Sequence, residues 1–161
     1  MGRRVLFVCS ANQTRSPIAA KMFEKMLQRA GIGGIEVMSA GTFSGGGEPA
    51  SATTREMAAT MGLDLSAHKS SLITTEMIRS SDLILVMEEL HRASIINLCP
   101  DLDDRVRLLS SFVPYDGPDI GIPDPTGLPP LAYRSCFARI LESLEGLLRT
   151  IQNEWIVDNL Q

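Results

Sequence analysis

The sequence is poor in aromatic residues and contains no long apolar run. Only 5% of its 161 residues are aromatic, which argues against a membrane-binding or carbohydrate-binding surface. No stretch approaches the roughly 18 consecutive apolar residues of a membrane-spanning helix, and the run at residues 5–9 is too short for the core of a signal peptide. We therefore expect a cytoplasmic protein that does not insert into a membrane.

Cysteine and positive charge are also scarce. Cys9, Cys99 and Cys136 are an odd number at unrelated spacings, which suits a reducing compartment better than a disulfide framework. No CxxC pair or Cys/His cluster suggests zinc, and we expect neither a metal ion nor a cofactor. The net charge of −4 disfavours nucleic acid as a partner, because proteins that follow the phosphate backbone normally carry a basic face.

The pattern of apolar residues predicts one α/β domain over residues 1–161, a length that suits a single core. Apolar runs predict strands at residues 3–9, 35–39, 82–87 and 106–109. Helical periodicity and stop signals predict helices at residues 18–30, 51–61, 88–97 and 137–151. This alternation implies a parallel twisted sheet with helices on both faces, a three-layer αβα arrangement that binds ligands at the carboxyl ends of its strands.

The segment VCSANQTRSP places Cys9 and Arg15 six positions apart, at the end of the first predicted strand. Small or polar residues lie between them, and Ser16-Pro17 resembles a helix start, with a capping hydroxyl followed by a proline. A connection of this kind can curl so that its backbone N–H groups converge on an anion, while the positive end of the following helix adds to the attraction. The segment therefore predicts a phosphate-binding loop.

The same loop gives Cys9 and Arg15 chemical roles. An anion-binding field favours a thiolate over a thiol, and the thiolate is the nucleophilic form of cysteine. The planar guanidinium of Arg15 can hold two phosphoryl oxygens of the transferred group. A cysteine that ends an apolar strand is commonly a packing residue, and a Cys–Arg pair at this spacing also arises by chance. The strand before the loop and the helix start after it favour the catalytic interpretation.

Several further segments extend the pattern along almost the whole chain. They are VLFVCSANQTRSP at 5–17, SAGT at 39–42, GLDLSAHKS at 62–70, DLILVMEELH at 82–91 and PDPTG at 123–127. Together they resemble the low-molecular-weight protein tyrosine phosphatases, whose signature is Cys-x5-Arg-Ser near the N-terminus and an Asp-Pro loop near the C-terminus. The resemblance implies a four-stranded sheet of order 2-1-3-4 and hydrolysis of phosphomonoesters through a phosphocysteine intermediate.

By this resemblance, Asp124 is the general acid, which protonates the leaving oxygen while Cys9 attacks and later activates the water that cleaves the phosphocysteine. An acid is needed because an unprotonated alkoxide or phenoxide leaves poorly. Pro123 and Pro125 would stiffen the loop that presents it, within a connection at 110–130 that is longer than most structureless loops. Without the cysteine loop, Asp124 would be interpreted as a turn residue.

The resemblance also assigns roles to polar residues around the loop. Ser16 donates a hydrogen bond to the Cys9 sulfur, which helps the sulfur to leave in the second step. Asn12 occupies the left-handed backbone region and is fixed by hydrogen bonds from Ser39 and His68. Taken alone, His68 would be interpreted as a surface-turn histidine. The residues expected to bind the phosphate are Ser10, Ala11, Asn12, Gln13, Thr14 and Arg15.

The sequence departs from the tyrosine-specific members around the substrate pocket. Those members have aromatic residues directly after the Asp-Pro pair, where this chain has Thr126 and a glycine. They also have an aliphatic residue at the position of Gln13. We expect Gln13, Phe43 and Thr126 to line the pocket, with Phe43 as one wall. Tyr115 and Tyr133 either contribute further walls or are packing residues.

The resemblance nevertheless implies a protein tyrosine phosphatase, with a phosphorylated protein and a cognate tyrosine kinase as its expected partners. A protein arginine phosphatase is the alternative, because such members also lack the aromatic wall, although they use a threonine at the position of Gln13. Thioredoxin-coupled arsenate reduction would need a resolving pair, for which Cys99 and Cys136 are the candidates. A non-catalytic phosphate-binding module would need neither nucleophile nor acid. We expect a monomer or weak dimer, with residues 155–157 covering the core or forming the dimer contact.

Oxidation provides a test of the loop sequence. Many family members carry a second cysteine just before the arginine, which protects the nucleophile through a reversible disulfide. Because this chain has Thr14 there, we predict that peroxide oxidises Cys9 beyond the sulfenic acid. The measurement is the activity recovered by a thiol reductant after prolonged peroxide treatment, which we expect to be incomplete. Full recovery would contradict the prediction.

Overall fold

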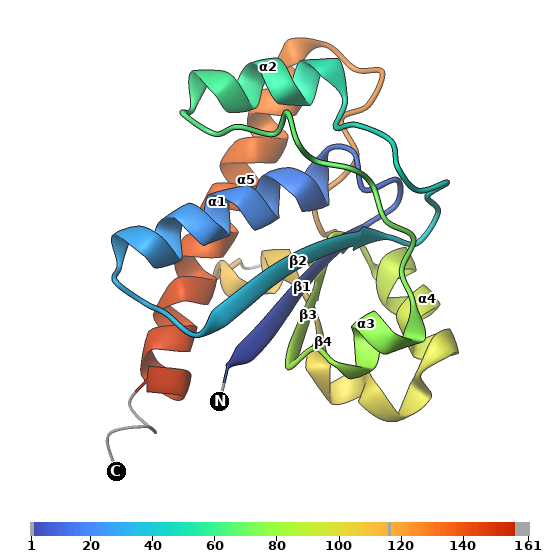
Figure 1. The fold of residues 1–161 in the computed structure, drawn as a ribbon, viewed down its shortest axis with the longest axis vertical. Helices are drawn as coiled ribbons and strands as arrows, with labels where there is room; N and C mark the ends of the chain where they lie inside the picture. Colours follow the sequence, from blue (N-terminus) through green and yellow to red (C-terminus); the bar gives the residue numbers. More distant parts are fainter. Residues whose placement is uncertain (1, 116, 157–161) are drawn as a thin grey trace.

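Four parallel strands form the centre of the fold (Figure 1). The structure is a computed structural model and describes residues 2–115 and 117–156. The strands are β1 (Arg3–Cys9), β2 (Ile35–Gly41), β3 (Leu83–Val86) and β4 (Val106–Leu108). Their order across the sheet is β2-β1-β3-β4, and every neighbouring pair is parallel. The predicted fold class and strand order are therefore confirmed.

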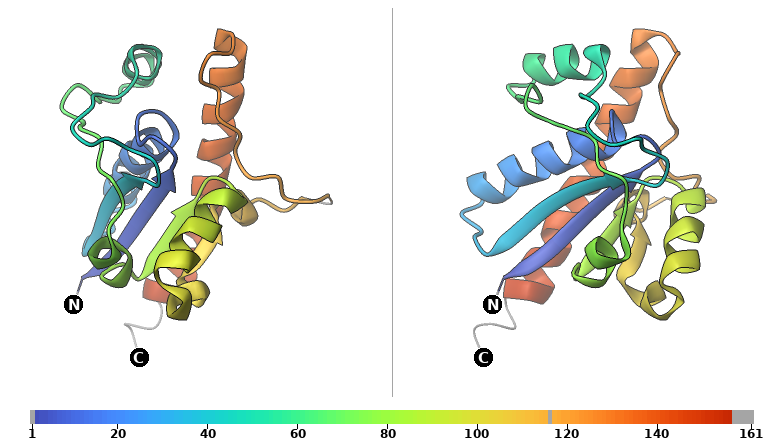
Figure 2. Two further views of the ribbon diagram at one scale, coloured as in Figure 1. Left: turned by 90° about the vertical axis from the view of Figure 1, so that its right-hand side faces the viewer. Right: turned by 45° about the vertical axis from the view of Figure 1, so that its right-hand side comes forward.

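Helices cover both faces of this sheet (Figures 1 and 2). The α-helices of the described residues are α1 (Arg15–Arg29), α2 (Ala52–Thr60), α3 (Thr75–Arg79), α4 (Glu89–Leu98) and α5 (Pro130–Ile151). Shorter helical turns are η1 (Pro100–Arg105), η2 (Leu109–Phe112) and η3 (Gln152–Ile156). Helices α1 and α5 lie on one face, and α3 and α4 lie on the other.

Strand β1 is buried on both faces because it lies inside the sheet. Val5 and Phe7 join the core cluster formed with α1 and α5, here called the α1–α5 cluster. Leu6 and Val8 join the cluster formed with α3 and α4, the α3–α4 cluster. Burial on both faces explains why this strand is continuously apolar instead of alternating. The strand ends with Cys9 at the carboxyl edge of the sheet, between the ends of β2 and β3.

The start of α1 differs from the prediction. The helix begins at Arg15, with Thr14 in the N-cap position, so the predicted capping role of Ser16 is wrong. Ser16 lies inside the first turn, and its hydroxyl contacts the Cys9 sulfur instead of a helix amide. The Ser16-Pro17 pair does lie in the first turn of the helix, which begins one residue earlier, at Arg15.

Two other elements also differ from the prediction. Strand β2 continues to Gly41, which the sequence analysis left out of the strand, and Gly41 pairs with Cys9. A Cβ at Gly41 would lie 2.4 Å from the Ser10 carbonyl oxygen, so glycine is needed for the close approach of the two segments. The helix α3 was not predicted, because its five residues are too few to show a helical period.

The connection between β4 and α5 is anchored to the rest of the fold. Asp119 accepts the amide of Gly121 at 2.9 Å, and Arg139 of α5 donates to the Gly121 carbonyl at 3.1 Å. The amide of Ile122 donates to the carbonyl of Met87, the residue after β3, at 2.7 Å. The Asp-Pro segment that follows is thereby brought to the carboxyl edge of the sheet.

The three cysteines and Trp155 belong to the core or pack against it. Cys9, Cys99 and Cys136 are buried and unpaired. Trp155 packs against the α1–α5 cluster, with the guanidinium carbon of Arg3 5.2 Å from its ring centroid. Val157, the last residue of the predicted C-terminal contact, lies outside the described residues. Across residues 2–115 and 117–156, none of the helices combines the length and apolar character needed to cross a membrane.

Gly121→Ala should destabilise the protein more than Gly127→Ala. Both glycines have positive φ values, 75° and 79°, at which an alanine costs about 1–2 kcal/mol. A Cβ at Gly121 would also lie 2.3 Å from the Met87 carbonyl oxygen, whereas a Cβ at Gly127 meets nothing within 4 Å. We expect urea denaturation to show a free energy of unfolding about 2 kcal/mol lower for Gly121→Ala than for Gly127→Ala. Equal losses in the two variants would contradict the predicted clash.

Candidate active site

The loop at residues 10–14 connects β1 to α1, and several carbonyl groups along it accept hydrogen bonds from neighbouring segments. The carbonyls of Cys9 and Ser10 accept amides from the segment after β2, both at 2.9 Å, and the carbonyl of Gln13 accepts the amide of Ser51 at 3.0 Å. In a trans peptide the N–H points opposite to the C=O of the preceding residue. The amides that follow these carbonyls therefore point into the loop, as an anion cradle requires.

The Cys9 sulfur lies beside a hydroxyl whose hydrogen bonds have a defined direction. Sγ is 2.9 Å from Ser16 Oγ, and Ser16 Oγ accepts a hydrogen bond from Asn12 Nδ2 at 2.8 Å. The hydroxyl has one proton of its own to donate. The competing acceptor, the Ala40 carbonyl oxygen, is farther away, at 3.4 Å. The arrangement therefore favours Ser16 as the donor and the Cys9 sulfur as the acceptor of this hydrogen bond.

Asn12 is held in the left-handed backbone region, with φ of 58°. Its Nδ2 donates to Ser39 Oγ at 3.0 Å, and His68 Nε2 donates to its backbone carbonyl at 2.7 Å. The structure therefore brings the predicted residues Asn12, Ser39 and His68 together, but Ser39 accepts the hydrogen bond that it was expected to donate. A contact that the sequence analysis missed is the amide of Ser71, which donates to Asn12 Oδ1 at 3.0 Å. No sequence signal reports a backbone amide of this kind.

Arg15 is the first residue of α1, and only 2% of its side chain is exposed. Its Nη1 donates to Glu88 Oε1 at 2.5 Å and to the Ile122 carbonyl at 2.8 Å. Its Nη2 lies 3.8 Å from Asp124 Oδ2, too far for a hydrogen bond. Within the described residues, Nε and Nη2 make no hydrogen bond. One edge of the guanidinium is thus left for two oxygens of an oxyanion.

Glu88 and His91 belong to the site, although the sequence analysis gave them no role. Glu88 is the N-cap of α4, and the two residues form a capping box in which the Glu88 amide donates to His91 Nδ1 at 3.0 Å. His91 is fully buried, and its Nε2 lies 2.8 Å from Ser10 Oγ. Their position directly after a buried strand predicts that they lie at the carboxyl edge of a parallel sheet, but it does not indicate which residues they contact.

His91 is a neutral histidine with a defined tautomer. Burial lowers its pKa from 6.5 to about 4, and the Arg15 charge acts in the same direction, whereas Glu88 and Asp124 act in the opposite direction. Because a backbone amide can only donate, Nδ1 is the unprotonated ring nitrogen and Nε2 carries the proton.

Asp124 lies in a half-exposed turn opposite Arg15. Its Oδ1 accepts two hydrogen bonds from Thr126, one from the amide at 3.1 Å and one from Oγ1 at 2.7 Å. Thr126, which the sequence analysis placed in the pocket, therefore orients this carboxyl group. The other oxygen, Oδ2, faces the guanidinium of Arg15.

Thr14 belongs to a group of three hydroxyls that joins the loop to α2. Ser51 Oγ donates to Thr54 Oγ1 at 2.6 Å, Thr54 Oγ1 donates to Thr14 Oγ1 at 3.1 Å, and Thr14 Oγ1 lies 3.3 Å from Ser51 Oγ. Ser51 also caps α2 by accepting the Thr54 amide. The residue that replaces the family's second cysteine thus connects the loop to the N-terminus of α2.

The residues considered for the substrate pocket differ in exposure. Phe43 is 87% exposed and Tyr115 is 68% exposed, whereas Gln13 is half-buried. Tyr133 is buried in the α1–α5 cluster, where its ring packs edge-on against Phe137 with a centroid distance of 6.2 Å. Tyr133 is therefore a packing residue and not a wall of the substrate pocket.

Cys99 and Cys136 lie on opposite faces of the sheet. Cys99 belongs to the α3–α4 cluster, and Cys136 belongs to the α1–α5 cluster. Burial raises the pKa of the Cys136 thiol to about 12. A disulfide needs Cα atoms within about 7 Å, so the two residues cannot form the resolving pair that arsenate reduction would need.

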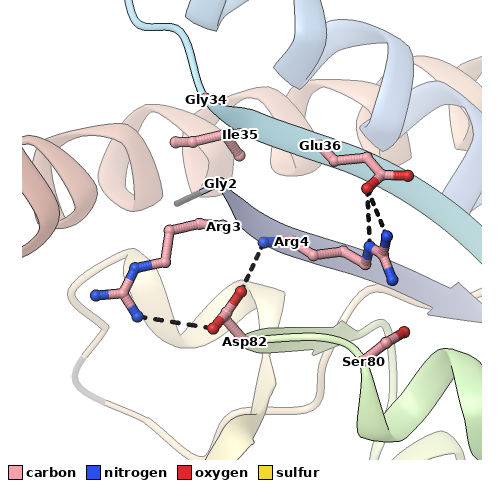
Figure 3. A pocket seen from close by; sticks show the side chains of 8 residues that line it. All are labelled: Gly2, Arg3, Arg4, Gly34, Ile35, Glu36, Ser80 and Asp82. Carbon is pink, nitrogen blue, oxygen red and sulfur yellow. Dashed lines mark hydrogen bonds and ion pairs between the residues drawn. The ribbon is translucent and has the colours of Figure 1, made fainter.

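A cavity of about 610 Å³ lies at the opposite edge of the sheet, around the amino-terminal ends of the strands (Figure 3). Its lining includes Arg3, Arg4, Glu36 and Asp82. Arg4 Nη2 is 2.7 Å from Glu36 Oε2, and Arg3 Nη1 is 3.6 Å from Asp82 Oδ1. Each arginine faces an acid, so the cavity offers no unpaired charge to a phosphate.

The fold and the site together define a class of protein. A strand-loop-helix cradle that begins with a buried cysteine and ends with a buried arginine, faced by an aspartate, is the arrangement of a cysteine-dependent phosphatase. The family model for low molecular weight phosphotyrosine protein phosphatases matches residues 4–157. The chain belongs to this family.

The individual relatives divide between two names. The protein-arginine-phosphatase of Geobacillus stearothermophilus is 33% identical over 154 residues, which cover 96% of this chain and 99% of the relative. The low molecular weight protein-tyrosine-phosphatase Etp of Escherichia coli is 32% identical over 151 residues, which cover 94% and 90%. The crystal structure of the low molecular weight protein tyrosine phosphatase from T. tengcongensis has a TM-score of 0.84 at 30% identity, covering 92% of this chain and 99% of that one.

His91→Gln should flatten the pH dependence of stability between pH 6.5 and about pH 4. Because folding lowers the pKa of His91, the unfolded chain binds this proton first as the pH falls, and the wild type loses stability across that window. One such group contributes a slope of at most about 1.4 kcal/mol per pH unit. The measurement is the free energy of unfolding in urea at several pH values, with His68→Gln as the control. Identical slopes in wild type and His91→Gln would refute the assignment.

Proposed function

We propose that this enzyme hydrolyses phosphotyrosine in proteins, with Cys9 as nucleophile, Arg15 as phosphate ligand and Asp124 as general acid. The observation that carries the proposal is the hydrogen bond from Ser16 Oγ to Cys9 Sγ at 2.9 Å, inside a loop whose amides point inward. A buried arginine with one unused edge closes the same loop. Mere packing of a cysteine would require none of these polar partners.

In the first step, the Cys9 thiolate attacks phosphorus. The S–P bond forms while the bond to the leaving oxygen breaks, and Asp124 gives that oxygen its proton. The inward amides of residues 10–14 and the Nε–Nη2 edge of Arg15 stabilise the equatorial oxygens, which bear the developing charge. The products are a neutral leaving alcohol and a phosphocysteine.

In the second step, Asp124 acts as a base. It takes a proton from a water molecule that attacks phosphorus, and the S–P bond breaks as the new O–P bond forms. The electron pair returns to Cys9, where the Ser16 hydrogen bond stabilises the thiolate. Asn12 keeps Ser16 in this orientation through its own hydrogen bond. Inorganic phosphate is released and Asp124 is protonated again.

The substrate proposal depends on Phe43. This side chain is highly exposed, and its backbone amide donates to the carbonyl of Ser10, so it lies beside the loop where a phenyl ring can stack. Phosphoarginine is the second candidate, because one relative covering nearly the whole chain is named a protein-arginine-phosphatase. The turn after Asp124 also carries Thr126 and a glycine in place of an aromatic wall.

The wider setting follows from the same features. We propose that residues 1–161 form one domain, because both core clusters share a single sheet. The free cysteines support a cytoplasmic location. We propose a phosphorylated protein as substrate, with its cognate kinase as a further partner, and a monomer or weak dimer in solution.

The test compares hydrolysis of phosphotyrosine, phosphoarginine and phosphoserine peptides. We expect the highest kcat/KM for phosphotyrosine, a loss of more than about 10³-fold in kcat for Cys9→Ser, and a loss of about 10²–10⁴-fold for Asp124→Ala. Cys99→Ala, which changes a buried cysteine outside the site, should retain activity. Undiminished turnover in Cys9→Ser would overturn the mechanism, and a preference for phosphoarginine would select the second candidate.

The role of Asp124 has its own test. An acid matters less when the leaving group is already stable as an anion, so Asp124→Asn should slow phenyl phosphate much more than 4-nitrophenyl phosphate. The measurement is kcat/KM for both substrates in wild type and variant, because kcat also contains the hydrolysis of the phosphocysteine, which is the same step for both substrates. Equal slowing of the two substrates would contradict proton donation by Asp124.

A further inference from the structure

Ser10 spans the cradle from one neighbouring strand to the other. Its carbonyl accepts the amide of Phe43, on the β2 side, at 2.9 Å. Its side chain reaches the opposite side, where Oγ lies 2.8 Å from Nε2 of His91 in the first turn of α4. Ser10 is also the residue directly after Cys9, and it begins the loop that follows the nucleophile.

The direction of the Ser10–His91 hydrogen bond is fixed by a third group. The Glu88 amide donates to His91 Nδ1, so the ring proton is on Nε2, and Nε2 must donate to Ser10 Oγ. The serine oxygen is therefore an acceptor in this contact and keeps its own proton. Within the described residues, that proton has no acceptor in the protein, whereas the hydroxyls of Ser16 and Thr14 each have two hydrogen-bond partners.

We propose that the Ser10 hydroxyl donates this proton to an oxygen of the bound phosphoryl group, and that His91 is the positioning residue that holds the hydroxyl for it. The inference rests on the proposed function and adds a side-chain donor to a cradle otherwise built from amides and Arg15. An oxyanion is the acceptor that fits, because Ser10 belongs to the loop whose amides, together with Arg15, supply the positive charge of the cradle.

One structural unit then positions two phosphate ligands. Glu88 holds Arg15 through Nη1, and the capping box that contains Glu88 also sets the tautomer of His91. His91 is fully buried, so its ring has little freedom to release Ser10. A doubly protonated ring would place an N–H against the Glu88 amide, and the neutral ring is therefore the form that can position Ser10.

The experiment is a double-mutant cycle with Ser10→Ala and His91→Leu. The readouts are kcat and KM for the best phosphopeptide and the dissociation constant of inorganic phosphate by calorimetry. We expect Ser10→Ala to lower kcat/KM and phosphate affinity by about tenfold, as for one hydrogen bond to a charged group. His91→Leu should also lower kcat/KM and phosphate affinity. The double variant should lose no more of either than Ser10→Ala alone, because both changes remove the same donor.

Conservative variants separate positioning from folding. Ser10→Thr keeps the hydroxyl, and His91→Gln keeps an N–H donor, so both should retain most of the activity that Ser10→Ala and His91→Leu lose. A purely structural role of His91 would lower the melting temperature and act independently of Ser10. Losses that multiply in the double variant, or unchanged phosphate affinity and kcat/KM in Ser10→Ala, would overturn the proposal.

The outcomes also separate this inference from the proposed function. If the wild type hydrolyses none of the peptides, the proposed function fails, while the phosphate titration still tests the Ser10 donor. If the wild type is active and Ser10→Ala matches it in both readouts, only the Ser10 inference fails. Should His91→Leu not fold, Ser10→Ala together with His91→Gln decides the question.

Discussion

The guanidinium of Arg15 carries a full charge although it is almost completely buried, and the carboxyl edge of the sheet is arranged around it. Removing such a charge from water costs several kcal/mol unless partners replace the lost hydration. Glu88 and the Ile122 carbonyl do so, and they come from the end of β3 and from the connection before α5. The charge can be buried only when these two segments meet at the carboxyl edge of the sheet. Both partners bind Nη1, so the Nε–Nη2 edge of the guanidinium is left for an oxyanion.

Around this charge, the direction of one hydrogen bond determines the direction of the next one. Asn12 donates to Ser16, which leaves the Ser16 proton for Cys9. The Glu88 amide donates to His91, which places the ring proton toward Ser10. In both cases an N–H group that can only donate begins the sequence of hydrogen bonds. It thereby determines which hydrogen bond the hydroxyl of Ser16 or Ser10 accepts and leaves the hydroxyl proton for another partner. The site is thereby preorganised, which is what electrostatic stabilisation of a transition state requires.

Much of the fold and part of the site could be predicted because they depend on local sequence. The apolar run of β1, the small residues after it and the helix behind them bring Cys9, Asn12 and Arg15 together within one strand-loop-helix unit. The errors arose where a tertiary contact overrode a local signal. Ser16 has the sequence of a cap, but its hydroxyl is used by the sulfur, and Gly41 was left out of the strand it extends beside Cys9.

The sequence by itself determined the sheet, the loop and the identity of the chemical groups, because period, spacing and residue type are local properties. Only the tertiary structure decided which distant residues complete the site. Glu88 is separated from Arg15 by 73 positions and His91 from Ser10 by 81, and no local pattern reports a contact across such distances. The physical reason is that parallel strands adjacent in the sheet bring their carboxyl ends together regardless of their separation along the chain.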